Sequence, residues 1–271
     1  MVGRGVVVLL EYIVGGALVG AVVGATGVGG GSLMTPLLTL VFGLPAQVAV
    51  GTDLLFASIT KFSGALAHWR RGNVQWSIAG WLTLGSVPAA LATIEALRLW
   101  DPNAAQFGAF VRPALASALL LTAAGLLFRS QIQALGRRFS AAPDEAQAQP
   151  ASPARPVPTV AVGLVIGVMV TLTSVGAGVI GVVALLYLYP TLIAKRLVAV
   201  DIAHAIPLTL VAGLGHVALG TVNWPVLGAL LVGSVPAISL GALLADRLPE
   251  RVLRVLLAAM LTLIGTRLVV V

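Results

Sequence analysis

The stretch GATGVGGGSLMTPL, residues 24–37, interrupts a strongly apolar chain with five glycines, two threonines and a serine. It separates an apolar segment at 6–26 from one at 33–43 that has only eleven residues. Eleven residues reach about 16 Å as a helix, roughly half of the ~30 Å hydrocarbon core of a bilayer. The stretch therefore predicts a broken backbone followed by a half-helix that begins near Ser32.

Composition decides the class of protein. Of the 271 residues, 59% are hydrophobic and 9% are charged, whereas a soluble domain is about 25% charged. Apolar stretches recur along almost the whole chain, which predicts an all-α, polytopic protein of the cell membrane with the lipid bilayer as a partner. The net charge of +7 comes from short arginine clusters between apolar segments. That placement is typical of membrane topology and not of nucleic-acid binding.

A second copy of the same unit follows 148 residues after the first. At this offset Asp53 falls on Asp201, and the run GSVP at 85–88 falls on the same four letters at 233–236. Repeats with matched hydropathy are a recognised design of secondary transporters. The predicted organisation is a first membrane repeat at 1–128, a cytoplasmic linker with five prolines at 129–158, and a second membrane repeat at 159–271.

Each repeat contains five apolar segments, and the second of the five is too short to span a bilayer. The expected segments are 6–26, 33–43, 46–68, 74–97 and 105–128 in the first repeat, and 159–175, 179–189, 194–217, 223–245 and 252–271 in the second. The chain is therefore expected to form about ten segments, of which two are short discontinuous helices.

Positive charges indicate how the two repeats are oriented, because short cytoplasmic loops are enriched in Lys and Arg. The first repeat carries Arg70 and Arg71 between its third and fourth segments, where the second repeat has the uncharged LGTVN at 219–223. The second repeat carries Lys195 and Arg196 between its second and third segments, where the first has LPAQ. Because a parallel repeat would place matching loops on one side, this exchange predicts inverted repeats.

The two glycine-rich breaks are candidates for a ligand site. The second break, SVGAG at 174–178, also precedes an eleven-residue segment. The start of a helix presents free N–H groups and the positive end of its dipole, so two opposed half-helices would suit an anion. Small residues also permit close helix packing, and this structural alternative stays open.

Ionisable residues inside apolar segments cost about 2.5–3.5 kcal/mol on insertion scales and therefore suggest function. Asp53 and Lys61 occur in the third segment, and Asp201 and His204 occur in the eighth. Asp201 and His204 are one turn apart and can pair. We expect proton coupling or charge relay from all four residues. The alternative is structural: each aspartate caps a neighbouring helix or pairs permanently with Lys61 or His204.

Residues 27–76 resemble the TauE/SafE family of membrane exporters, which is associated with sulfite and small organosulfonates. The motifs that carry the resemblance are the glycine run at 29–31, Pro36, GLP at 43–45, AVGT at 49–52 and RRG at 70–72. The second repeat echoes them less fully, since it has VGAG at 175–178 and Asp201 but no GLP. The resemblance implies a small oxyanion held near the half-helix starts, with the Ser32 and Thr52 hydroxyls nearby.

Together these features predict a secondary active transporter that exports sulfite or a small organosulfonate by alternating access. The expected substrate-binding residues are Gly29, Gly30, Gly31, Ser32, Thr52, Ser174, Gly176 and Gly178. The chain has no cysteine and three scattered histidines, so we expect no metal site. We also expect no cofactor, no nucleic-acid partner and no enzymatic activity. The coupling ion, for which a proton is the first candidate, and assembly into a homo-oligomer stay open.

Three other functions remain as alternatives. A sodium-coupled importer of a small organic anion would also use broken helices and acidic residues. A passive anion channel would need no coupling residues. A membrane-embedded enzyme would need a dense polar cluster at one depth, and the charges of this chain are scattered instead.

Overall fold

The computed structural model describes residues 2–26, 31–70, 74–100, 104–128, 130, 131, 134, 155–176, 178–192, 194–245 and 250–270. Within these ranges the chain forms ten α-helices, one short π-helix and no strand. The elements are α1 Val2–Thr26, α2 Gly31–Pro36, η1 Leu37–Val41, α3 Ala46–Arg70, α4 Trp76–Trp100, α5 Ala104–Leu127, α7 Pro156–Thr173, α8 Val179–Leu188, α9 Ala194–Ala218, α10 Trp224–Ala245 and α11 Glu250–Val270.

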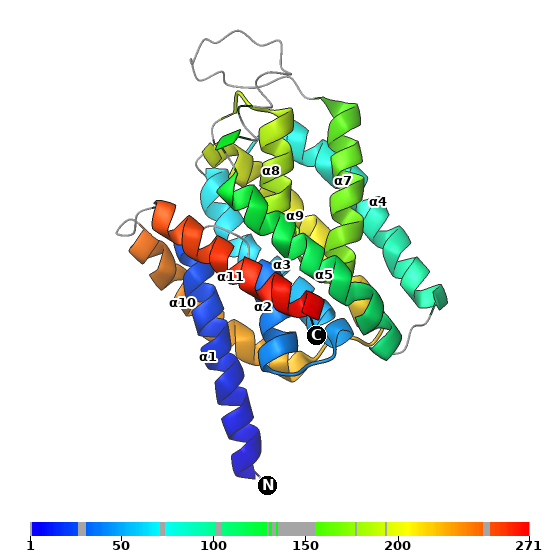
Figure 1. Ribbon diagram of the computed structural model, residues 1–271, viewed down its shortest axis with the longest axis vertical. Helices are drawn as coiled ribbons and strands as arrows, with labels where there is room; N and C mark the ends of the chain where they lie inside the picture. Colours follow the sequence, from blue (N-terminus) through cyan, green and yellow to red (C-terminus); the bar gives the residue numbers. More distant parts are fainter. Residues whose placement is uncertain are drawn as a thin grey trace.

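The helix boundaries confirm the predicted all-helical class and the number of segments. The helices α3 and α9 both contain 25 residues and begin 148 residues apart, at Ala46 and Ala194. The predicted linker at 129–158 lies mostly outside the described residues. Figure 1 shows α8 toward the upper end of the molecule and α2 toward the lower end.

Five of the described helices are long and apolar enough to cross a membrane by length and composition. They are α4, α5 from Ala105, α7, α9 from Arg196, and α10 up to Gly241. Shorter apolar helical stretches cover Leu9–Gly24 and Ala258–Leu268. The helix α3 is not among these helices, and it carries the charged residues Asp53 and Lys61.

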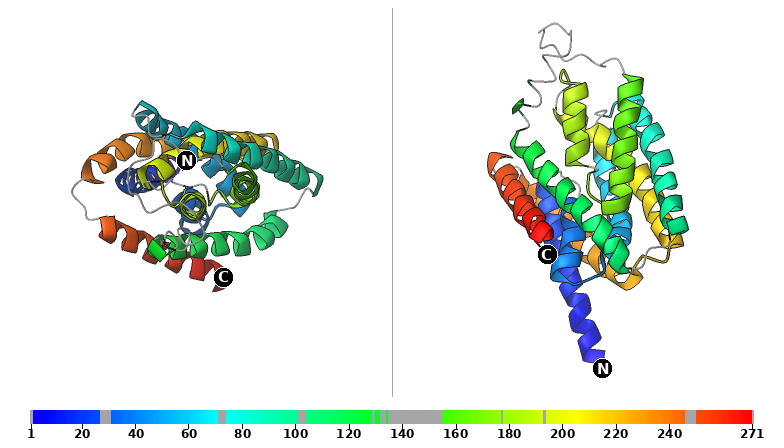
Figure 2. Two further views of the ribbon diagram at one scale, coloured as in Figure 1. Left: turned by 90° about the horizontal axis from the view of Figure 1, so that it is seen from above. Right: turned by 45° about the vertical axis from the view of Figure 1, so that its right-hand side comes forward.

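Helices pack across the two halves of the sequence. The helix α1 packs against α10 and α4 packs against α7, while α3 lies against α9 and α5 against α11. Figure 2 shows α5 and α11 together along one face, with α4 on the opposite face. The central crossing of α3 and α9 is therefore enclosed by helices from both halves.

The α1–α10 and α4–α7 interfaces are built alike. A Cβ atom added to Gly16 of α1 would touch the carbonyl oxygen of Leu230, and one added to Gly163 of α7 would touch the carbonyl oxygen of Leu82. Leu82 and Leu230 are 148 residues apart and thus occupy equivalent places in the repeat. Backbone meets backbone at both interfaces because these positions have no side chain, as small residues allow between membrane helices.

Contacts along each pair give the relative helix directions. Gly51 of α3 packs against Thr221, just after α9, and Leu55 packs against Gly213 of α9, so α3 and α9 run in opposite directions. Along α1 and α10, Gly16 meets Leu230 and Gly20 meets Ser234, so these two helices run in the same direction.

The second glycine-rich stretch breaks the backbone as predicted. The helix α7 ends at Thr173, and Ser174 adopts a left-handed conformation with φ of 57°. Gly176 and Gly178 follow with φ of 122° and 145°, and α8 begins directly afterwards. Such φ values favour glycine, so the non-glycine Ser174 is the costly position of the break.

The first half-helix begins at Gly31, next to the predicted start at Ser32. It is not a regular α-helix, because Pro36 is followed by the π-helical turn η1. Proline has no N–H to donate to the preceding turn, and a local π-turn can satisfy the backbone groups that it frees. The equivalent α8 lacks proline and remains α-helical over its ten residues.

Candidate transport site

The carboxylate of Asp53 is bound to the first half-helix. Thr35 donates both its backbone N–H and its hydroxyl to Asp53 Oδ2, at 3.1 Å and 2.5 Å. Both residues are fully buried. Asp53 thus lies in α3, and its carboxylate accepts hydrogen bonds from the adjacent short helix. A negative charge there is favourable to the dipole of that helix.

Asp201 has the equivalent arrangement in the second half. It lies buried in α9, and its carboxylate interacts with the backbone N–H of Gly178, the N-cap of α8. Gly181, one turn into α8, has no side chain, and a Cβ atom there would touch Asp201 Oδ1. The glycine therefore lets the carboxylate reach the start of the short helix.

Lys61 lies within electrostatic range of both carboxylates. It is buried in α3, two turns after Asp53, and interacts electrostatically with Asp53 and with Asp201. A buried cation between two carboxylates compensates charges that would be expensive in a membrane interior. One lysine therefore serves both halves of the repeat.

His204 is also buried, but the structure places it against α4. Its Nε2 lies 2.8 Å from the Ser86 hydroxyl. Its Nδ1 has no hydrogen-bond partner among the described residues. The pairing with Asp201 that the spacing allowed is therefore replaced by a contact with another helix.

The Thr52 hydroxyl has a structural partner. It accepts a hydrogen bond of 3.0 Å from the backbone N–H of Asn223, in the loop between α9 and α10. This bond fixes the α3–α9 crossing and leaves Thr52 buried. Nearby, His216 is also buried and spans from Thr221 to the carbonyl of Thr171. These two contacts hold His216 inside the structure.

Ser174, in the second break, lies near Asp53 of the first repeat. Its buried side chain lies close enough to Asp53 to interact with the carboxylate, although Ser174 Oγ makes no hydrogen bond of standard geometry within the described region. Asp53 Oδ1 and Asp201 Oδ1 also lack a partner there. Buried oxygens without partners are unusual in native proteins, and each calls for an explanation such as a bound proton, water or ion.

The remaining predicted residues are only partly described. Gly29 and Gly30 lie outside the described residues, and no side-chain environment is described for Gly31 and Ser32. Gly176 is buried in the second break, and Gly178 is half-buried beside it. The described part of the site therefore comes from α2, α3, α4, the second break and α9.

Two residues of this site were absent from our sequence prediction. Thr35 is one turn inside the first short helix, and no charge or repeat marks it. Ser86 belongs to the repeated GSVP run, whose partner Ser234 is buried as well. The repeat was thus a usable signal for Ser86.

Replacing Thr35 by valine should lower the free energy of unfolding by about 1.5–3 kcal/mol, because a buried carboxylate loses a charge-assisted donor. Denaturation of the purified protein in detergent measures this loss. Thr209→Val is the matched control, since that buried hydroxyl donates only to carbonyls of its own helix, those of Ala205 and Ile206. An equal loss in both variants would contradict the role given to Thr35.

The comparisons with known proteins agree with this architecture. The family model described as "Sulfite exporter TauE/SafE" matches residues 12–268. The chain is 36% identical over 223 residues to the "Probable membrane transporter protein YjnA" of Bacillus subtilis (strain 168), covering 82% of this chain and 85% of the relative. It is 29% identical over 216 residues to YdhB of the same organism, covering 79% and 81%. No solved structure matches the chain.

Proposed function

The chain belongs to the sulfite exporter TauE/SafE family of membrane transporters, and on this premise we propose that it exports sulfite or a small organosulfonate by alternating access. The observation that carries the proposal is the placement of Asp53 against Thr35, one turn inside the first short helix, and of Asp201 at the N-cap of the second. The start of a helix is where an anionic substrate would bind. The protein supplies its own carboxylate close to the start of each short helix.

Competition between carboxylate and substrate gives a simple mechanism. A substrate anion and an ionised Asp201 repel each other at the start of α8, so the anion binds best when the carboxylate is protonated. Anion and proton then move together, and export runs down the outward gradient of the anion. Lys61 would hold whichever carboxylate remains ionised, and His204 would relay the proton.

Substrate contacts are proposed at the residues predicted from sequence. Ser174 has the strongest support, because its hydroxyl lies at the break and near Asp53. Gly176 and Gly178 leave the adjacent backbone open to a ligand. The partners from the first break would be Gly29, Gly30, Gly31 and Ser32. Thr52 would act more indirectly, since its oxygen already accepts the Asn223 N–H.

We further infer that the two repeats are inverted. The equivalent helices α3 and α9 make contacts in opposite order, and the short helices lie toward opposite ends in Figure 1. Both observations support a membrane arrangement in which the two half-helices approach one central site from opposite sides.

Transport by purified protein in sealed vesicles tests the function. We expect saturable flux of sulfite or a small sulfonate, with counterflow when the same anion is loaded on the other side. Flux should fall at least tenfold with Gly178→Leu, which would crowd the start of α8, and should remain with Arg98→Gln at the exposed end of α4. A folded protein that moves none of these anions would sink the proposal.

A sodium-coupled importer is the second candidate. It is favoured by the unpartnered oxygens of Asp53, Asp201 and Ser174, since carboxylate and hydroxyl oxygens are ligands for hard cations. Replacing external sodium by potassium during uptake separates the two functions. Uptake that collapses without sodium supports the importer, and unchanged flux removes it.

A further inference from the structure

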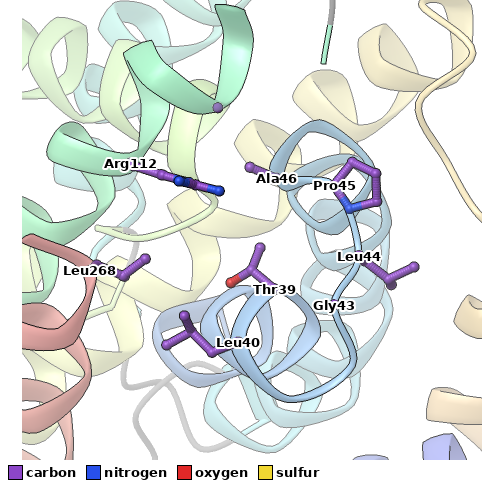
Figure 3. Close-up of a pocket in the computed structure, with 9 residues that line it drawn as sticks. Thr39, Leu40, Gly43, Leu44, Pro45, Ala46, Arg112 and Leu268 are labelled. Carbon is purple, nitrogen blue, oxygen red and sulfur yellow. The ribbon is translucent and has the colours of Figure 1, made fainter. Parts of the chain in front are cut away.

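A cavity of about 410 Å³ lies between η1, the start of α3 and α5, and its described lining includes neither Asp53 nor Asp201. Figure 3 shows Arg112 reaching from α5 across this cavity toward Ala46, with Thr39 and Leu268 at its other walls. Its volume falls in the range of ordinary small-molecule sites, roughly 300–1,000 Å³.

Arg112 is an unusual residue in a candidate membrane span, and its side chain is exposed. It is the eighth residue of the candidate span Ala105–Leu127, so it lies about 10 Å along the helix from the start of that span. The equivalent position in the second repeat is Met260, so the packing of the repeat does not require a charge there. An arginine inside a span is expensive unless it faces water or an anion.

The cavity has the chemistry of an amphiphilic anion site. None of the described residues that line it is acidic, and most are apolar, including Leu40, Pro45 and Leu268. Ala46 begins the 25-residue helix α3, whose positive dipole end adds to the charge of Arg112. The Thr39 hydroxyl already donates to helix carbonyls, so the guanidinium is the main donor toward a ligand.

We propose that this cavity is a second anion site in which Arg112 binds a sulfonate or phosphate group while the apolar wall holds its organic part. The site is separate from the Asp53 and Asp201 cluster, and it rests on the proposed function only for the choice of a sulfonate as ligand. A free organic anion and an anionic lipid headgroup share this chemistry, and the experiment distinguishes them.

Thiol labelling tests the site independently of transport. The chain has no cysteine, so Thr39→Cys introduces a single thiol at the cavity wall. Its reaction rate is measured with two thiosulfonate reagents, one carrying a sulfonate and one carrying a trimethylammonium group. The reagents differ by two charges, so one arginine that lines the same cavity changes the ratio of their rates on the order of tenfold. Arg112→Gln should lower the anionic-to-cationic ratio by that factor.

Matched variants and two ligand arms complete the experiment. Arg112→Lys should keep most of the ratio, and Arg98→Gln should leave it unchanged. Protection of the thiol by a soluble alkanesulfonate in phosphatidylcholine vesicles identifies a free anion, whereas protection by phosphatidylglycerol alone identifies a lipid headgroup. Either result supports the site. A ratio that does not respond to Arg112→Gln overturns it.

Failure of this site and failure of the transport function give different results. If wild-type protein moves no anion but the labelling ratio still depends on Arg112, the proposed function falls and the cavity site stands. If flux is normal and the ratio is insensitive to Arg112, the cavity site falls alone.

Discussion

Replacing Asp201 by asparagine should abolish the response of anion transport to a pH gradient. Asparagine keeps an oxygen for the Gly178 N–H but stays neutral at every working pH, so it imitates the protonated carboxylate permanently. If one proton accompanies each anion, one pH unit across the vesicle changes the equilibrium anion ratio about tenfold. The variant should show no such change while still exchanging labelled for unlabelled anion.

A sulfonate is the proper substrate for this measurement, because it stays ionised across the working pH range and cannot follow the gradient by itself. Wild-type protein should accumulate the sulfonate in the alkaline compartment, the direction of proton flow. The conservative control is Asp201→Glu, which can still titrate. Retained pH-driven accumulation in Asp201→Asn would exclude Asp201 as the coupling group.

Replacing Gly233 by alanine should lower the free energy of unfolding by about 1–3 kcal/mol, the usual cost of overpacking. The added Cβ atom would meet the carbonyl oxygen of Ile13 in α1. That oxygen belongs to helix backbone, which cannot rotate away as the end of a side chain could. The midpoint of thermal or denaturant unfolding in detergent measures the change.

Gly228 provides the matched control on the same helix. A Cβ atom there has no heavy atom within 4 Å, and alanine is intrinsically better than glycine in a helix by about 0.8–1.0 kcal/mol. Gly228→Ala should therefore be neutral or stabilising. The same contrast is expected in α4 between Gly85, which meets the carbonyl of Val160, and the open Gly80. Equal effects within either pair would disprove close backbone packing there.

The hydrophobic pattern and the 148-residue offset were enough to predict the helical class and nearly all helix boundaries. These two signals predicted the boundaries because the length of an apolar segment and the offset between repeats can be read from the sequence without the structure. The π-turn after Pro36 was not predictable in this way, since it depends on how a local break is accommodated against neighbouring helices. The sequence predicted a half-helix there, and nothing in it pointed to a π-turn.

The site was predicted less completely, and particular residues show why. Asp53, Lys61 and Asp201 were found because charge inside an apolar segment is conspicuous. Their partners are a backbone N–H of Gly178 and a threonine, which have no distinctive sequence pattern. Spacing on one helix suggested that His204 pairs with Asp201, but a neighbouring helix supplied Ser86 instead. Contacts between helices cannot be read from the period of one helix.

The glycine-lined interfaces have a mechanical consequence. Each joins a helix of one repeat to a helix of the other, α1 with α10 and α4 with α7, through backbone contacts. Such contacts leave little freedom to slide without clashes, so each pair should behave as one stiff body. For the proposed alternating-access cycle we therefore expect these interleaved pairs to move as units, and not the two sequence repeats as separate halves.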